Sequence, residues 1–357
     1  MNEQVKHEGG GTAPEKKSRR WIWNIVFLLV AVLSIWAVAS QNKGFSLRAF
    51  WASVTRAKPG WLAGAAGCML GFIFFEACAL RSACRTLDCP VTLRAGCLYA
   101  ASDIYFSAIT PSATGGQPAC GYLMMRGGMS GMAATAVLLL NLATYSLAIL
   151  FIGLVSLVLR PGVFLRFGAP SRVLIAVGFA VQLGLALLFL VLTSSERLLK
   201  RICAWGLRVM GKLRILRDKE KWQSKLRRAM EDYRRCAQLF GGERSLLLRS
   251  FGFNVLQRAS QISVTMLVFL AMGGRPALAL DVWAMQSYVV IGSNSVPVPG
   301  AMGVADYMML DGLSAILPEP IAVDMELLSR SLSFYCCILL CALMVLFSYR
   351  KKKGWNQ

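Results

Sequence analysis

The sequence predicts an all-α membrane protein whose chain crosses the bilayer several times. Apolar runs of about 20 residues recur along it, and a helix of that length spans a hydrocarbon core of ~30 Å. Hydrophobic residues make up 56% of the chain and charged residues only 16%, with a mean hydropathy of +0.54. This composition is more apolar than that of ordinary soluble domains, so membrane spans should account for most of the chain.

Six apolar runs have the length of a full span. We expect these spans at residues 21–39, 61–80, 130–159, 173–195, 250–274 and 327–349. The first run is too long for a signal peptide, lacks a cleavage signature and begins a series of spans, so we expect it to be retained.

Pro/Gly clusters interrupt two further apolar stretches, at residues 110–118 and 297–303. Proline removes an amide donor and glycine weakens a helix, so such a break at membrane depth needs protein or water to satisfy its polar groups. The helical arms beside the breaks hold roughly 13 to 16 residues, which is short for a crossing. We therefore expect re-entrant helical hairpins at residues 96–125 and 282–317.

Basic residues set the predicted orientation. Loops rich in lysine and arginine stay in the cytoplasm, and short clusters beside a span carry the most weight. The basic residues gather in segments 16–20, 81–94, 196–249 and 350–353. We therefore expect these segments and both termini to be cytoplasmic, in the plasma membrane of a bacterium.

This orientation makes the two halves of the chain inverted copies. The first hairpin enters from the cytoplasm and the second from outside, so each half reads span, span, hairpin, span with opposite topology. The predicted units are a disordered basic tail at 1–20, a first repeat at 21–159, a second repeat at 173–349 with an amphipathic insertion at 196–249, and a basic tail at 350–357.

The net charge of +21 does not predict nucleic-acid binding, because the basic residues flank membrane spans on one side. Two interpretations of the insertion stay open. It packs on anionic membrane lipids as a basic amphipathic helix, or its residues 214–240 bind a protein partner.

Metal, cofactor and catalytic chemistry are not expected. The eleven cysteines lack the close pairing and histidine partners of a zinc site. The single histidine, His7, excludes a His-based catalytic triad within one chain. No GxxxxGK[ST] phosphate loop is present, so ATP hydrolysis by that route is not expected either.

Five ionisable residues are predicted at membrane depth, where a charge is costly and usually functional. They are Glu76, Asp103, Arg258, Asp306 and Arg330. Arg258 is predicted either to bind an anion or to form a structural ion pair with Glu76 or Asp306. Arg330 lies near an outer end, where it could instead extend toward the interface.

The three carboxylates are candidate coupling residues. A desolvated Asp103 or Asp306 could carry a proton, although capping a helix is an equal alternative. Glu76 lies close to the end of its span and could simply mark the cytoplasmic boundary.

The two breaks add a second candidate feature for anion binding. Helices that start after Gly116 and Gly300 would present unpaired amides and a positive dipole end to a phosphate or carboxylate. The alternative is a pair of packing kinks. The predicted substrate-binding residues are Thr110, Pro111, Gly115, Gly116, Gln117, Arg258, Pro299, Gly300, Gly303, Asp306 and Arg330.

At the breaks the chain resembles a known family. Residues 109–118 read Ile-Thr-Pro-Ser-Ala-Thr-Gly-Gly-Gln-Pro, and residues 298–306 read Val-Pro-Gly-Ala-Met-Gly-Val-Ala-Asp. They resemble the TP...GGQP and PTPGGxGxxE motifs of the lysylphosphatidylglycerol synthase transmembrane (flippase-like) family. Arg330 matches an arginine common in the following helix of that family. Asp306 stands where the family has glutamate, and Ala301 replaces a glycine.

The resemblance implies movement of phospholipids, typically aminoacylated ones, between leaflets, as in the flippase half of multiple peptide resistance factors. Because the chain ends at Gln357 without a soluble transferase domain, we do not expect it to synthesise the lipid. The expected substrate is a phospholipid or a prenyl-linked lipid, and a homo-oligomer is possible. Alternatives are a transporter of a small anionic solute, an intramembrane enzyme acting on lipid phosphate and an accessory scaffold for a lipid-modifying enzyme.

Overall fold

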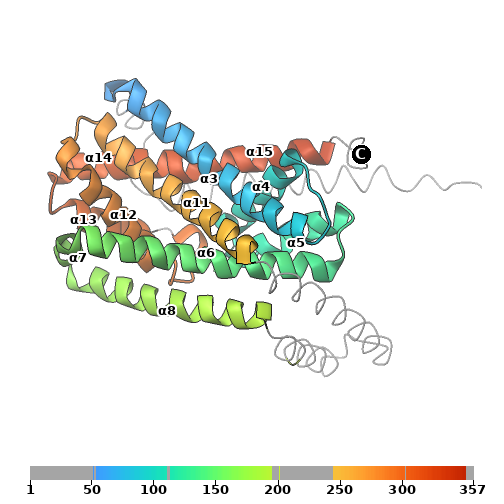
Figure 1. Ribbon diagram of the computed structural model, residues 1–357. Coiled ribbons are helices and arrows are strands. Elements are labelled where there is room, and N and C mark those ends of the chain that lie inside the picture. The colour runs from blue at the N-terminus through green and yellow to red at the C-terminus, as the bar shows by residue number, and fades with distance from the viewer. Residues whose placement is uncertain are drawn as a thin grey trace, which may run out of the picture. The chain divides into compact units, whose positions relative to one another are not determined.

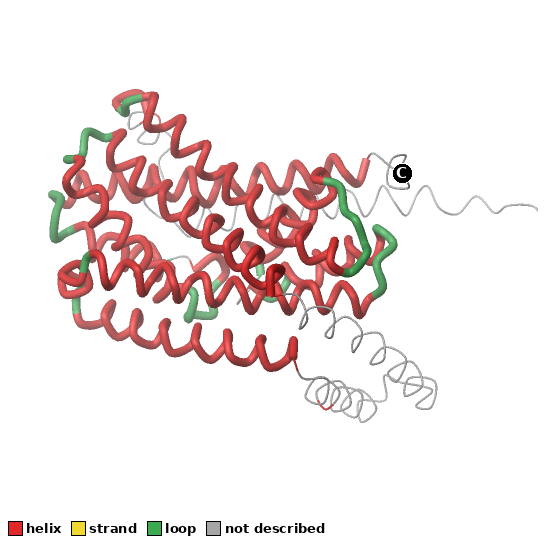
Figure 2. The backbone as a smooth tube through the Cα atoms, viewed as in Figure 1, coloured by secondary structure: helices red, strands yellow, loops and turns green. Residues whose placement is uncertain are grey.

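Every regular element that the structure describes is a helix, which confirms the predicted all-α class (Figure 2). The computed structural model describes residues 51, 54–110, 113–194, 201, 244–301 and 303–350. The predicted first span, the 1–20 tail, most of the 196–249 insertion and nearly all of the C-terminal tail lie outside these residues.

Long helices alternate with shorter pieces along the chain (Figure 1). The elements are α3 (Pro59–Thr86), α4 (Leu93–Ile109), α5 (Gly116–Arg126), α6 (Gly131–Leu159), α7 (Pro161–Arg166), α8 (Ala169–Ser194), α11 (Arg244–Ala271), η2 (Pro276–Leu278), α12 (Ala279–Ser293), η3 (Pro299–Ala301), α13 (Val304–Leu313), α14 (Glu319–Arg330), η4 (Ser331–Cys336) and α15 (Cys337–Arg350).

Local signals explain where several helices begin. Pro59 and Pro161 each open a helix, at a position where the missing amide would be unpaired anyway. Thr92 and Ser130 precede α4 and α6, and their hydroxyls accept the backbone N–H groups three residues later at 3.3 and 3.2 Å.

Four helical segments in the described part are long and apolar enough to cross a membrane, so the protein is a membrane protein. They are Pro59–Thr86, Gly131–Leu159, Ala169–Leu192 and Glu319–Ser348. They correspond to four of the six predicted spans. The last one comprises α14, η4 and α15, and its middle turn is a π-helix at Ser331–Cys336.

The predicted span 250–274 corresponds to α11, which is 28 residues long but is not among those four segments. Polar side chains recur on it at helical spacing and find partners on neighbouring helices. Asn254 Nδ2 donates to Asn141 Oδ1 at 3.2 Å and to Thr144 Oγ1 at 3.0 Å. The Thr265 and Ser329 hydroxyls lie 2.6 Å apart. Because α11 packs against α3, α6, α12 and α14, its polar face is covered by protein rather than by lipid.

Both predicted breaks separate two packed helices. The first pair is α4 and α5, which together run from residue 93 to 126, against the predicted 96 to 125. The second pair is α12 and α13, which run from 279 to 313, against the predicted 282 to 317. Figure 1 draws α5 and α13 toward opposite ends of α3, α6 and α11. Whether the two hairpins re-enter a membrane from opposite sides stays a prediction.

Contacts between the helix ends agree with the predicted sidedness. The Lys58 N–H donates to the carbonyl of Ala271 at 2.8 Å, which joins the start of α3 to the end of α11. Arg166 Nη1 contacts Asp281 Oδ2 at 2.8 Å, which adds α7 and the start of α12 to the same end. The charge pattern predicts that this end is external, and side-specific labelling of cysteines placed at Leu165 and Arg94 would test the assignment.

Close backbone approach between α8 and α12 yields a stability prediction. A Cβ on Gly178 would overlap the carbonyl oxygen of Ile291 and lie 2.7 Å from its carbonyl carbon, whereas a Cβ on Gly184 of the same helix would meet nothing within 4 Å. Gly178→Ala should therefore lower the unfolding free energy by about 1–3 kcal/mol, while Gly184→Ala should not lower it. Thermal unfolding in detergent measures both, and equal melting temperatures would contradict the packing described.

Candidate functional site

The first break is a turn closed by Thr110. Its hydroxyl donates to the carbonyl of Phe106 at 2.7 Å and accepts the N–H of Gly115 at 2.8 Å. A Cβ on Gly115 would lie 2.6 Å from Thr110 Cγ2, so the turn requires a residue without a side chain there. Pro111 lies outside the described residues.

Asp103 of α4 lies against the first residues of α5. Its carboxylate accepts hydrogen bonds from Gln117 Nε2 at 2.7 Å and from the Ser107 hydroxyl at 3.3 Å. A Cβ on Gly116 would overlap Asp103 Oδ1, which shows how closely the carboxylate approaches this helix start. The position predicted for a bound anion is thus taken up by a carboxylate of the chain itself.

Glu76 of α3 joins this carboxylate. The two carboxyl groups interact electrostatically, and Glu76 Oε2 accepts a hydrogen bond from Gln257 Nε2 at 2.9 Å. Glu76 and Asp103 are 4% and 6% exposed. Glu76 is therefore an interior residue of the helix bundle.

Arg258 of α11 is a cation beside this pair. It interacts electrostatically with both carboxyl groups, but no ion pair within 4.0 Å links it to an acid in the described part of the chain. Its guanidinium lies 4.2 Å from the ring centroid of Tyr145 and hydrogen-bonds Gln261. Arg258 is 8% exposed, and its Nε–H has no partner among the described residues. The ion pair with Glu76 or Asp306, one of the two alternatives for Arg258, is thus not formed within 4.0 Å among the described residues.

The second break needs left-handed backbone. Gly300 has φ 59° and Gly303 has φ 76°, a conformation that glycine adopts without steric cost. Ala301, which replaces a motif glycine, also has positive φ, 52°, at a cost on the order of 1 kcal/mol. Gly300 packs against the ring of Phe334. The η3 turn, which comprises Pro299, Gly300 and Ala301, contacts α4. The two broken segments therefore meet inside the bundle.

A second cluster of charged groups lies beside this break. Asp306 Oδ2 accepts the N–H of Gly303 at 3.0 Å, and Asp306 Oδ1 lies 2.6 Å from Arg330 Nε. Glu326 Oε1 is 3.8 Å from the same nitrogen, so both carboxylates lie beside Arg330. The Nη2 group of Arg330 is buried and has no hydrogen-bond partner in the described part. As in the first cluster, a carboxylate of the chain occupies the helix start, here by capping α13.

Sequence reasoning missed Glu326, Gln257 and Tyr145. Glu326 lies one helical turn before Arg330, a spacing that could have signalled it, but the predicted span began at residue 327. Gln257 and Tyr145 are neutral, and no local pattern sets them apart. Tyr145 connects the two regions, because it contacts Arg258 and interacts with Asn294 at the start of the second break.

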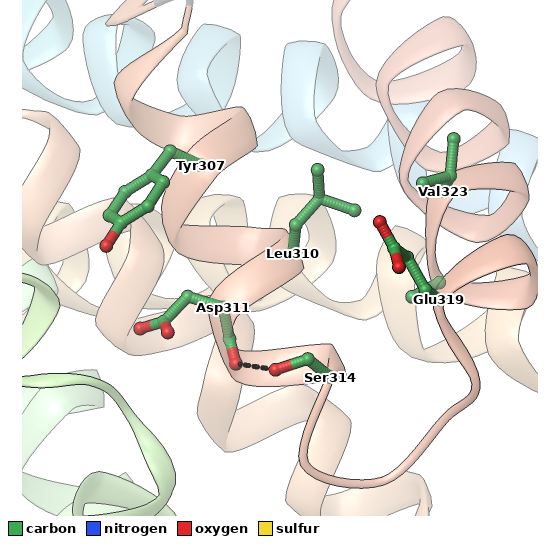
Figure 3. Close-up of a pocket in the computed structure, with 7 residues that line it drawn as sticks. Tyr307, Leu310, Asp311, Ser314, Glu319 and Val323 are labelled. Carbon is green, nitrogen blue, oxygen red and sulfur yellow. Dashed lines mark hydrogen bonds between the residues drawn. The ribbon is translucent and has the colours of Figure 1, made fainter.

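A cleft of about 290 Å³ lies elsewhere, between α13 and α14 (Figure 3). Its lining includes Tyr307, Asp311 and Glu319, and none of the predicted site residues belongs to it. Asp311 is already engaged, since its carboxylate accepts the N–H of Gly168 at 2.9 Å and its carbonyl accepts the Ser314 hydroxyl at 2.8 Å. The two charged clusters do not line this cleft: the first is buried, and in the second the Asp306 and Arg330 side chains are 16% and 17% exposed.

The helices and clusters define a polytopic membrane protein with two broken helices and buried charges at both breaks. A family model described as the lysylphosphatidylglycerol synthase TM region matches residues 22–341. The match spans most of the chain, so the protein belongs to this membrane family, and the predicted family is confirmed. A search of the curated proteins found no match.

Proposed function

We propose that the protein moves a lipid with a phosphate-bearing head group between the leaflets of a membrane. Membership of a lipid-related membrane family supports this function. The observation that carries the proposal is the pair of arginines, Arg258 and Arg330, each of which has a buried N–H group without a hydrogen-bond partner among the described residues.

Unused arginine donors favour an anionic ligand. Leaving a charged donor buried without a partner costs about 1–3 kcal/mol or more in free energy. Such a group is therefore expected where a ligand accepts its hydrogen bond. A guanidinium offers parallel N–H groups that fit phosphate oxygens. The head group would bind between the two breaks, near Gly116, Gln117 and Gly300, while its tails stay in the bilayer.

The burial of Arg258 requires a moving part. Arg258 is 8% exposed, so a head group reaches it only after the packed helices separate. The packing order supports two matched units: α3, α4, α5 and α6 contact one another in sequence, and α11, α12, α13 and α14 repeat that order. We propose that the two units rock against each other around the breaks, as in other inverted-repeat carriers.

Reconstitution of the purified chain tests this function. Liposomes would carry a head-group-labelled fluorescent phosphatidylglycerol, and dithionite would bleach the label in the outer leaflet. Vesicles with protein should lose well over half of the fluorescence, while protein-free vesicles should lose about half. Uptake of radiolabelled inorganic phosphate is measured in parallel. Bleaching that stops at half in both samples would overturn lipid movement, and phosphate uptake without lipid movement would favour a small-anion transporter.

A further inference from the structure

We propose that a buried polar stripe on α11 is the path of the head group, and that its neutral amide oxygens select a head group that carries hydroxyl groups. This inference rests on the proposed function and adds the route and the chemical class of its substrate. The α11 stripe comprises six side chains: Ser250, Asn254, Gln257, Arg258, Gln261 and Thr265.

The α11 stripe follows one side of its helix through the bundle. At 3.6 residues per turn, the six positions fall within a sector of about 100° and extend over about 22 Å of the helix axis, most of a ~30 Å hydrocarbon core. Each of the six except Gln261 is at most 8% exposed. A polar surface of this length at membrane depth is costly, so a function is expected for it.

The stripe faces the other of the two proposed units. The α11 helix packs against α3 and α6 of that unit (Figure 1). Asn254 Nδ2 donates to Asn141 Oδ1 at 3.2 Å and to Thr144 Oγ1 at 3.0 Å, both on α6. Gln257 Nε2 donates to Glu76 Oε2 on α3 at 2.9 Å. Rocking of the units would therefore separate this side of α11 from α3 and α6 and open the stripe to a ligand.

Helix association alone does not account for the stripe. Polar side chains also hold membrane helices together, but in that role they pair donors with acceptors. Here Ser250 Oγ, Asn254 Oδ1 and Gln257 Oε1 are buried and have no hydrogen-bond partner among the described residues. Three such oxygens on one side of a helix point to a ligand that supplies O–H or N–H groups.

Arg258 narrows the chemical class of this ligand. Its Nε–H is a buried donor without a partner in the described part of the chain, and it follows Asn254 and Gln257 on the stripe. The ligand must therefore combine an anion with hydrogen-bond donors. A phosphodiester with hydroxyl groups, such as those of glycerol, meets both needs. The amide oxygens are neutral, so they suit a hydroxyl group better than an ammonium group, whose charge they would leave uncompensated.

Calorimetry on the full-length protein in detergent tests the selection. The probes are dihexanoyl-phosphatidylglycerol and dihexanoyl-phosphatidylmethanol, which carry the same single charge but differ in head-group hydroxyls. The wild type should bind the glycerol lipid on the order of tenfold more tightly, the effect of one or two hydrogen bonds. Asn254→Leu, a change to an apolar side chain of similar size, should remove most of that preference. Equal affinities for the two lipids in the wild type would overturn the selection.

Lipid movement in liposomes tests the path. The probe is phosphatidylglycerol labelled on an acyl chain, which keeps the head group intact. Asn254→Leu and Thr144→Val should slow dithionite bleaching of the inner leaflet by about tenfold or more, because a passing head group loses hydrogen bonds inside the bundle. Ser263→Ala is the matched control. Ser263 lies on the opposite side of α11 and accepts Trp283 Nε1 at 3.2 Å, so this variant also loses an interhelical hydrogen bond but should move lipid at the wild-type rate.

Cysteine labelling decides the question if an apolar variant does not fold. Asn254→Cys and Ser263→Cys place a small side chain on the stripe and opposite it, with the wild type as the reference for its native cysteines. A charged, water-soluble thiol reagent is applied in detergent. Position 254 should be labelled, and dihexanoyl-phosphatidylglycerol should slow that labelling, while position 263 should not react. Labelling of neither position, or of both equally, would overturn the path.

The outcomes separate the two proposals. Wild-type rates in both Asn254→Leu and Thr144→Val would overturn the path, while lipid movement by the wild type would still support the proposed function. A fall in melting temperature that accompanies the loss of movement, with unchanged preference between the two lipids, would assign the stripe to helix packing and overturn the path as well. If the wild type moves no lipid but inorganic phosphate protects position 254 from labelling, the path stands and lipid is not its substrate.

Discussion

Gly116→Ala is expected to stop lipid movement and to lower the free energy of unfolding by about 1–3 kcal/mol. The added methyl group would overlap the Ser107 hydroxyl and the carboxylate of Asp103, and it would lie 2.6 Å from the carbonyl oxygen of Asp103. A side chain can rotate away, but a helical carbonyl cannot move without its helix. The start of α5 would therefore separate from Asp103 and lose the hydrogen bond from Gln117.

Gly67→Ala is the matched control. Gly67 also lies in a helix, α3, but a Cβ there would meet nothing within 4 Å. Alanine favours helix by about 1 kcal/mol over glycine, so this variant should be as stable as the wild type or more stable. Melting temperature in detergent and dithionite bleaching in liposomes give both readouts. A Gly116→Ala protein that melts and transports like the wild type would show that the close approach at Gly116 is unimportant.

The spans could be predicted from sequence because lipid-facing helices must be apolar over their whole length. The α3, α6 and α8 helices satisfy that rule, and the breaks at Gly115 and Gly300 were visible because proline and glycine interrupt helices regardless of the tertiary fold. The α11 helix was found despite Asn254 and Gln257, since apolar residues still flank them. What the sequence does not reveal is that neighbouring helices cover this polar face.

The charged residues of the site were predicted one by one, but their partners were not. One of the two alternatives for Arg258 was an ion pair with Glu76 or Asp306, yet its guanidinium lies over Tyr145, and Asp306 contacts Arg330. Contacts between residues on different helices depend on how each helix is rotated about its axis, which a single sequence does not specify. For the same reason the carboxyl pairs, and the carboxylates at the helix starts, could be recognised only in three dimensions.

Arg258→Ala should have the largest effect on the proposed function. Hydrogen bonds to a charged group contribute about 1.5–3 kcal/mol each, so losing even one or two of them should weaken head-group binding on the order of a hundredfold. Arg258→Lys keeps the charge but offers no planar fork, so it should restore binding only in part. Arg275→Ala, at an exposed position after α11, removes the same kind of charge outside the clusters and should bind lipid normally.

Stability distinguishes a ligand-binding arginine from a structural one. Breaking a buried ion pair costs about 3–5 kcal/mol, but Arg258 has no ion-pair partner within 4.0 Å in the described part of the chain. Its contact with Tyr145 contributes about 0.5–2 kcal/mol, so Arg258→Ala should lose binding far more than stability. Melting temperature and calorimetric affinity of the same sample measure both. A stable Arg258→Ala protein with wild-type affinity would contradict the anion-binding role. An unstable variant rescued by Glu76→Gln would instead assign Arg258 to charge balance within the fold.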